Sequence, residues 1–188
     1  MTGFIQQAEK ISPLDEAAKD DLLQRLQSRS VAAGDYLLRE GRVCREILYI
    51  DEGLAKTFFA SGEKEFIMRF FPEQSLFTVL DSYVRQLPST YTILALEPST
   101  VTTISHTDME ELCRRHHGIE TFFRKLLSFA SVNMMKRISE MLEEDATARY
   151  NHFIRDYGPL LQRISLGDLA AYLGITQVSL SRIRGKKA

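Results

Sequence analysis

The sequence has 188 residues, of which 44% are hydrophobic, with 24 basic and 25 acidic side chains and a formal net charge of −1. This apolar content supports one large domain, or a medium and a small one, and it excludes a disordered chain. The N-terminal residues lack a signal-peptide core, and no apolar run approaches the roughly 18 residues of a membrane span, so we expect a soluble, cytoplasmic protein with no membrane partner.

The first half of the chain alternates between strand and turn signals. Residues 12–28 predict a short helix, with Leu22, Leu23 and Leu26 on one face. Between residues 30 and 106, short runs of β-branched and aromatic residues follow one another with turn residues between them, and Ser61-Gly62 is a hairpin signal. This pattern predicts an antiparallel sandwich, barrel or roll. The runs are 36–38, 47–50, 56–59, 66–71, 91–95 and 101–104.

The second half of the chain predicts helices. The stretch 119–144 contains no Pro or Gly, and two adjacent apolar stripes follow it at helical spacing. Two stripes indicate burial on more than one side, either inside a monomer or against both the roll and a second copy of the helix, and we favour the dimer. Residues 146–157 predict a further helix that ends at Gly158-Pro159. The stripes are Phe123, Leu127, Ala130, Met134, Ile138 and Met141, and beside them Phe122, Leu126 and Phe129.

The last part of the chain carries positive charge. Between residues 162 and 188 lie five basic side chains and one acidic side chain, Asp168, whereas the preceding residues are acidic overall. This asymmetry is typical of a nucleic-acid-binding end, although a solvated tail would also show it.

The most informative segment is residues 164–184, ISLGDLAAYLGITQVSLSRIR, which predicts two short helices joined by a tight turn. Ser165 and Thr176 are placed to cap the two helices. Gly174 suits the turn, and Leu180 suits the core that the helices of a helix-turn-helix share. The alternative is an αα-hairpin whose polar face meets only water. If the second helix lies in a major groove, the candidate DNA-contacting residues are Thr176, Gln177, Val178, Ser179, Ser181 and Arg182.

Together these features resemble the Crp/Fnr family of bacterial transcription regulators, over nearly the whole chain. Residues 31–41 and 50–56 resemble the opening strands and the next turn of the cyclic-nucleotide-binding β-roll. Gly174-Ile175-Thr176 with Leu180-Ser181-Arg182 resembles the recognition-helix signature of the family. The resemblance implies a homodimer joined along the long helix, a signal read in the roll, and a palindromic DNA operator and RNA polymerase as partners.

The chain departs from the family pattern in two places. Nucleotide-binding members hold the phosphate with a Gly-Glu pair and an Arg followed by Ser or Thr, but here Ser89 stands at the Arg position and Arg85 is out of register. Only residues 185–188 follow the second helix, so we expect the family's β-hairpin wing to be missing. We expect a small-molecule effector other than cyclic AMP, in a pocket formed by Phe77, Ser89, Thr90, Tyr91 and Met134.

We therefore expect an α+β fold in which residues 1–143 form an antiparallel, jelly-roll-like β-roll with flanking helices and a long dimer helix at about 119–143. Residues 144–188 are expected to form a helix-turn-helix domain that lacks a full wing. The predicted function is sequence-specific DNA binding by a regulator, and the competing hypothesis is a signalling module without DNA activity. We expect no enzymatic activity, cofactor or metal, because the histidines and the free thiols Cys44 and Cys113 show no catalytic or metal-ligand spacing.

Overall fold

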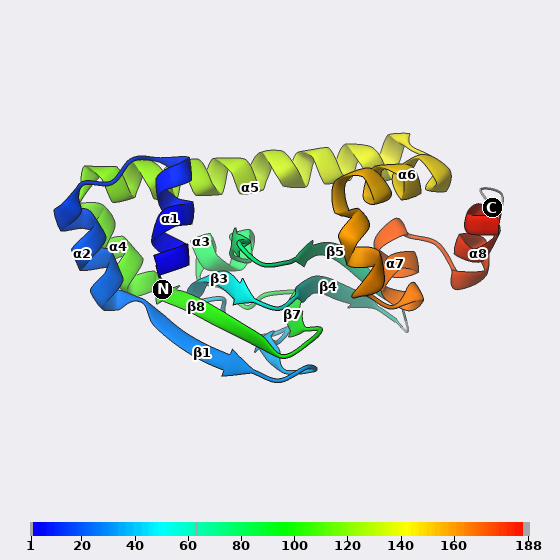
Figure 1. Ribbon diagram of the computed structural model, residues 1–188, viewed down its shortest axis with the longest axis horizontal. Helices are drawn as coiled ribbons and strands as arrows, with labels where there is room; N and C mark the ends of the chain where they lie inside the picture. The colour runs from blue at the N-terminus through cyan, green and yellow to red at the C-terminus, as the bar shows by residue number, and fades with distance from the viewer. Residues whose placement is uncertain (1, 63, 186–188) are drawn as a thin grey trace.

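The structure is a computed structural model that describes residues 2–62 and 64–185. The long helix α5 (His117–Glu143) runs along one side of a β-roll (Figure 1). The N-terminal helices lie at one end of α5, and the C-terminal helices lie at the other end. The predicted α+β fold with an antiparallel roll is confirmed, and the long helix begins within two residues of its predicted start.

Two four-stranded antiparallel sheets form the roll, with the strand orders β1-β8-β3-β6 and β2-β7-β4-β5. The hairpin between β4 and β5 turns at Ser61-Gly62 as predicted, since Ser61 pairs with Lys64. The sequence pattern missed β1, which is mainly polar, and β6, which has two residues. The strands are β1 Gln27–Val31, β2 Tyr36–Leu38, β3 Glu46–Glu52, β4 Ala55–Ser61, β5 Lys64–Phe71, β6 Leu76–Phe77, β7 Thr92–Ala95 and β8 Ser99–Ser105.

The helices differ from the prediction mainly at the N-terminus. The helix predicted at 12–28 is shorter, because Asp15 caps it through a 2.8 Å hydrogen bond from the backbone N–H of Ala18. An additional helix, α1, precedes it. The helix predicted at 146–157 has these bounds in the structure. Besides α5, the helices are α1 Thr2–Ile11, α2 Glu16–Arg25, α3 Leu80–Arg85, α4 His106–Arg115, α6 Ala146–Tyr157, the 3-10 helix η1 Gly158–Gln162, α7 Leu166–Leu173 and α8 Gln177–Gly185.

The main cluster of buried apolar side chains fills the roll and extends to the first half of α5. Phe4 of α1 is fully buried between Tyr49 of β3 and Phe122 of α5, with ring centroids 6.1 and 6.5 Å away. Burying a side chain of this size contributes roughly 1.5–3 kcal/mol. Helix α1 therefore secures the first half of α5 against the roll.

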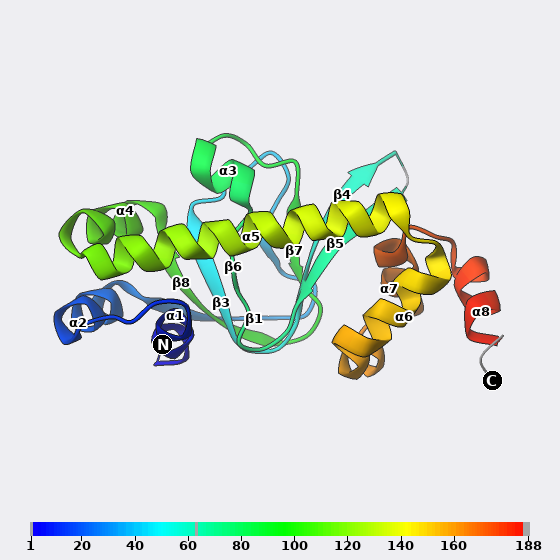
Figure 2. The ribbon, with the colours of Figure 1, turned by 90° about the horizontal axis from the view of Figure 1, so that it is seen from above.

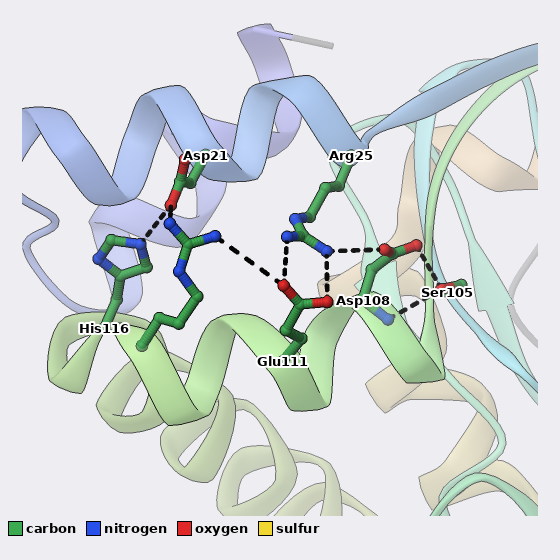
Figure 3. Close-up of polar contacts among 7 residues, drawn as sticks. Asp21, Arg25, Ser105, Asp108, Glu111 and His116 are labelled. Carbon is green, nitrogen blue, oxygen red and sulfur yellow. Dashed lines mark hydrogen bonds and ion pairs between the residues drawn. The ribbon is translucent and has the colours of Figure 1, made fainter.

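Charged side chains join α2 to α4 at the same end of the molecule (Figure 3). Arg25 donates to Asp108 at 3.0 Å and to Glu111 at 2.7 Å. The Nε2 atom of His116 lies 2.7 Å from Asp21, and this hydrogen bond is the main cause that lowers the pKa of the Asp21 carboxyl. These contacts hold α4 in place, and α5 begins directly after α4.

Candidate functional site

Helices α7 and α8 form the predicted two-helix unit with its caps and turn. The Ser165 hydroxyl accepts a 2.9 Å hydrogen bond from the N–H of Asp168, and the Thr176 hydroxyl accepts one of 3.2 Å from the N–H of Ser179. Gly174 ends α7 with φ of +68°, a conformation that residues with a Cβ rarely adopt. The two helices therefore meet at a sharp, well-defined angle.

One face of α8 is open to solvent along its whole length. Of the predicted DNA-contacting residues, all are exposed except Ser179, which is half-buried beside the Thr176 cap. The Gln177 amide lies against Gly167 of α7. Arg184 is also exposed and lies seven residues after Gln177, on the same face, so this helical spacing could have identified it from the sequence. Figure 2 shows α8 at the end of the molecule opposite α2.

The C-terminal helices share a hydrophobic core with the roll, which the sequence did not predict. The ring of Phe70 in β5 lies 6.0 Å from that of Phe153 in α6 and 5.6 Å from that of Tyr172 in α7. One cluster of buried side chains thus crosses between the two halves. It consists of Leu54, Phe58, Ile67 and Phe70 from the roll and of Tyr150, Phe153, Leu160, Leu169, Ala170, Tyr172, Leu173 and Leu180 from the C-terminal helices.

Ion pairs reinforce this junction. Lys56 of β4 has a side chain that is only 7% exposed, and its Nζ lies 2.7 Å from Asp168 and 3.1 Å from Glu65. Burial disfavours the charged form of Lys56, but the hydrogen bonds and charges of the two carboxylates outweigh it and raise the pKa. Arg163 binds Glu73 at 2.7 Å and lowers the pKa of that carboxyl to about 2. The C-terminal helices are therefore fixed to the roll of the same chain.

A cavity of about 380 Å³ lies among the roll, α3, α5 and the C-terminal helices. Phe77, Tyr91 and Met134 line it, as predicted, but Ser89 and Thr90 do not. The Ser89 hydroxyl is buried and forms two 2.9 Å hydrogen bonds with the backbone of Tyr91, and Thr90 is exposed to solvent. The structure thus brings three of the five predicted pocket residues together.

Two features are absent from residues 2–62 and 64–185. No group of three or more His, Cys, Asp and Glu side chains is arranged to hold a metal ion. No helix is both long enough and apolar enough to cross a membrane. Cys44 and Cys113 are free thiols, and burial is the main cause that raises the pKa of Cys113 to about 11, so this thiol stays protonated at neutral pH.

Comparison with known proteins assigns this architecture. The family model of the cyclic nucleotide-binding domain matches residues 28–116. The c-di-GMP-responsive global regulator CLP of Xanthomonas campestris is 15% identical, with a TM-score of 0.72 over 92% of this chain and 91% of its own. FixK2 of Bradyrhizobium japonicum is 12% identical, with a TM-score of 0.75 over 86% and 83% of the two chains. The chain therefore shares the fold of these regulators, the Crp/Fnr fold, and residues 28–116 match the cyclic nucleotide-binding model within it.

The assignment does not depend on these two structures alone. A Crp/Fnr-family protein from Eubacterium rectale is 16% identical, with a TM-score of 0.73 over 90% of this chain and 82% of its own. A comparison with curated protein sequences gives no significant match.

Within this Crp/Fnr fold, the two halves of α5 differ in exposure. In the first half, Ile119, Phe122 and Leu126 are buried in the roll. In the second half, large apolar side chains are exposed to solvent, so a single chain buries only part of the predicted stripes. The exposed side chains of the second half are Phe129, Val132, Met134, Met135, Ile138, Met141 and Leu142.

The expected absence of a wing concerns the end of the chain and lies outside the described residues, which end at Gly185.

Proposed function

We propose that the chain is a homodimeric, cytoplasmic transcription regulator rather than an enzyme. Residues 144–188 bind a palindromic DNA site, and residues 1–143 sense a small-molecule effector. The observation that carries the proposal is the exposed polar and basic face of α8, presented by a capped two-helix unit at one end of a Crp/Fnr fold. RNA polymerase is the proposed further partner, by analogy with transcription regulators of this fold.

The side chains of α8 suggest how a DNA sequence would be read. Gln177 lies in the first turn, where recognition helices contact bases, and glutamine prefers adenine. Val178 is 63% exposed and suits contact with a thymine methyl group. Ser181 and Arg182 continue the same face, while Thr176 and Ser179 hold the first turn in shape. We expect an A·T-biased half-site in which Arg182 contacts either a guanine or a phosphate.

The exposed apolar face of α5 supports the dimer. A monomer leaves this face in water, although each of its larger side chains contributes roughly 1.5–3 kcal/mol when fully buried. Two chains joined along α5 would present two copies of α8. Recognition helices of such dimers enter successive major grooves about 34 Å apart, so the DNA site should be an inverted repeat with its centres one helical turn apart.

The segment that corresponds to the family's phosphate-binding stretch supports an effector other than cyclic AMP. A buried phosphate favours a paired guanidinium. Of the segment 80–91, however, only Leu80, Asp81 and Tyr91 line the cavity, and the Ser89 hydroxyl bonds to the backbone of Tyr91 instead. This segment therefore contributes a carboxylate to the cavity and no cation.

Selection from a random duplex pool tests the DNA-binding proposal. The native chain should recover a palindromic motif. If Arg182 contacts a guanine, Arg182→Ala should reduce specificity at one base position and cost about 1–3 kcal/mol of binding free energy. If Arg182 contacts a phosphate, the variant should bind all sequences more weakly to the same extent, with a shallower salt dependence. Arg124→Ala is the matched control, because Arg124 is also exposed but lies on α5. Recovery of no motif, with unchanged binding in Arg182→Ala, would instead favour a signalling module without DNA activity.

A further inference from the structure

An unpaired arginine lies in the wall of the cavity. Arg69 of β5 is partly buried and lines the cavity. Within residues 2–62 and 64–185, no carboxylate forms an ion pair with it. A guanidinium that is partly removed from water and lacks a counter-charge is a favourable position for an anion.

A second arginine, which belongs to α5, also lines the cavity. The side chain of Arg137 in α5 is 11% exposed, its Cζ lies 3.9 Å from the ring centroid of Tyr172, and one terminal nitrogen donates to the Tyr172 carbonyl. Its other terminal nitrogen lies 3.8 Å from Glu140. Its Nε is buried and has no hydrogen-bond partner. Buried donors are rarely left unsatisfied, so this atom is suited to bind an acceptor that enters the cavity.

Tyr172 lines the same cavity as the two arginines. The Cζ of Arg137 lies 3.9 Å from the Tyr172 ring centroid, and the charges of both arginines oppose the rise that burial causes in the pKa of the Tyr172 phenol. Tyr172 belongs to α7 and to the core that the C-terminal helices share with the roll. A group bound between the two arginines would therefore touch the roll, α5 and the helix-turn-helix unit together.

The rest of the cavity is suited to an apolar group. Phe71 and Phe77 stack with their ring centroids 3.6 Å apart, and Leu126 and Ala130 of α5 also line the cavity. A volume of about 380 Å³ is within the range of small-molecule sites. The remaining charged residues of the lining are Lys136, Arg149 and His152 and the acids Asp81, Glu140 and Asp156.

These acids do not neutralise Arg69. Glu140 pairs with Arg137 and Lys136, and Asp156 pairs with Arg155 outside the lining. Asp81 belongs to α3, and its charge raises the pKa of Tyr91. Among residues 2–62 and 64–185, the Arg69 guanidinium thus has no carboxylate partner in an ion pair.

We propose that the cavity binds an amphipathic organic anion, with its acidic group between Arg69 and the Nε of Arg137 and its apolar part toward Phe71 and Phe77. The binding site itself is independent of DNA, whereas its regulatory meaning rests on the proposed function. Because Tyr172 belongs to α7, an occupied site secures α7 against the roll and so affects the position of α8.

Two dyes with the same aromatic skeleton test the site. Anilinonaphthalene sulfonate carries a negative charge, and phenylnaphthylamine lacks it. Arg69→Gln should weaken binding of the sulfonate to the folded chain by about tenfold, the scale of one lost charge-assisted hydrogen bond, and should leave the neutral dye unaffected. Arg124→Gln removes an exposed arginine outside the cavity and should change neither. Fluorescence titration measures both dyes, and circular dichroism verifies that each variant is folded.

The possible outcomes separate this site from the proposed function. Equal sulfonate affinity in Arg69→Gln and the native chain, or equal losses for both dyes, would overturn the anion site. A parallel titration with a selected DNA duplex should show that the sulfonate shifts DNA affinity in the native chain and not in Arg69→Gln. A chain that binds the sulfonate through Arg69 but binds no DNA would overturn the proposed function and leave the anion site standing.

Discussion

Removal of the Asp168 carboxylate should loosen the junction between the roll and the C-terminal helices. Asp168 accepts a hydrogen bond from the buried Lys56 at 2.7 Å and a second one from the Ser165 hydroxyl, also at 2.7 Å. In Asp168→Ala, Lys56 keeps only Glu65, whose side chain is 49% exposed and therefore a weaker partner. The Lys56 ammonium, whose side chain is 7% exposed, must then either stay buried with a weaker counter-charge or move out of the junction into solvent.

The expected cost follows from these partners. Breaking a fully buried ion pair costs about 3–5 kcal/mol, and the remaining Glu65 should reduce this to about 2–3 kcal/mol. The lost negative charge at the start of α7 adds roughly 0.3–1 kcal/mol. Lys56→Met in the same chain removes the uncompensated charge and retains an apolar stem, so the double variant should recover most of the loss.

Urea unfolding measures these free energies. The chain contains no Trp, so circular dichroism and tyrosine fluorescence are the appropriate signals. Asp156→Ala is the matched control, because the Arg155–Asp156 pair is exposed and should contribute less than about 1 kcal/mol. A loss below 1 kcal/mol in Asp168→Ala, or no recovery in the double variant, would refute the view that Lys56 and Asp168 stabilise the junction.

Three further predictions concern assembly, pH and ligand choice. Met134→Asp with Ile138→Asp should convert a sedimenting dimer to a monomer, and a native chain that is monomeric at tens of micromolar would contradict the dimer. Since Arg163 lowers the pKa of Glu73 from 4.5 to about 2, the stability from this pair is complete above pH 4.5 and is lost as the pH falls toward 2. Glu73→Gln should therefore make the free energy of unfolding fall by about 1 kcal/mol less as the pH drops. The change is this small because the Glu73 side chain is 40% exposed. Calorimetry should detect no submicromolar affinity for cyclic AMP, because the Ser89 hydroxyl is bonded to the backbone of Tyr91, and tight binding would reverse that inference.

Local signals in the sequence were sufficient for most of the elements. Helix caps, turn glycines and apolar periodicity act over a few residues, so Ser165, Gly174 and Thr176 correctly marked the ends of α7 and α8. For the same reason the Ser61-Gly62 turn and six of the strands were predictable. Alternation and spacing describe which face of an element is apolar. They do not say what covers that face.

The tertiary structure decided the features that depend on residues far apart in the chain. Helix α1 is stable because Phe4 meets Tyr49 and Phe122, which no local pattern indicates. The ion pair of Lys56 and the cavity at Arg69 arise only when the C-terminal helices pack on the hairpin of β4 and β5. Such contacts join side chains that are far apart in the sequence, 112 residues for Lys56 and Asp168, whereas a sequence pattern reports the conformational preferences of neighbouring residues.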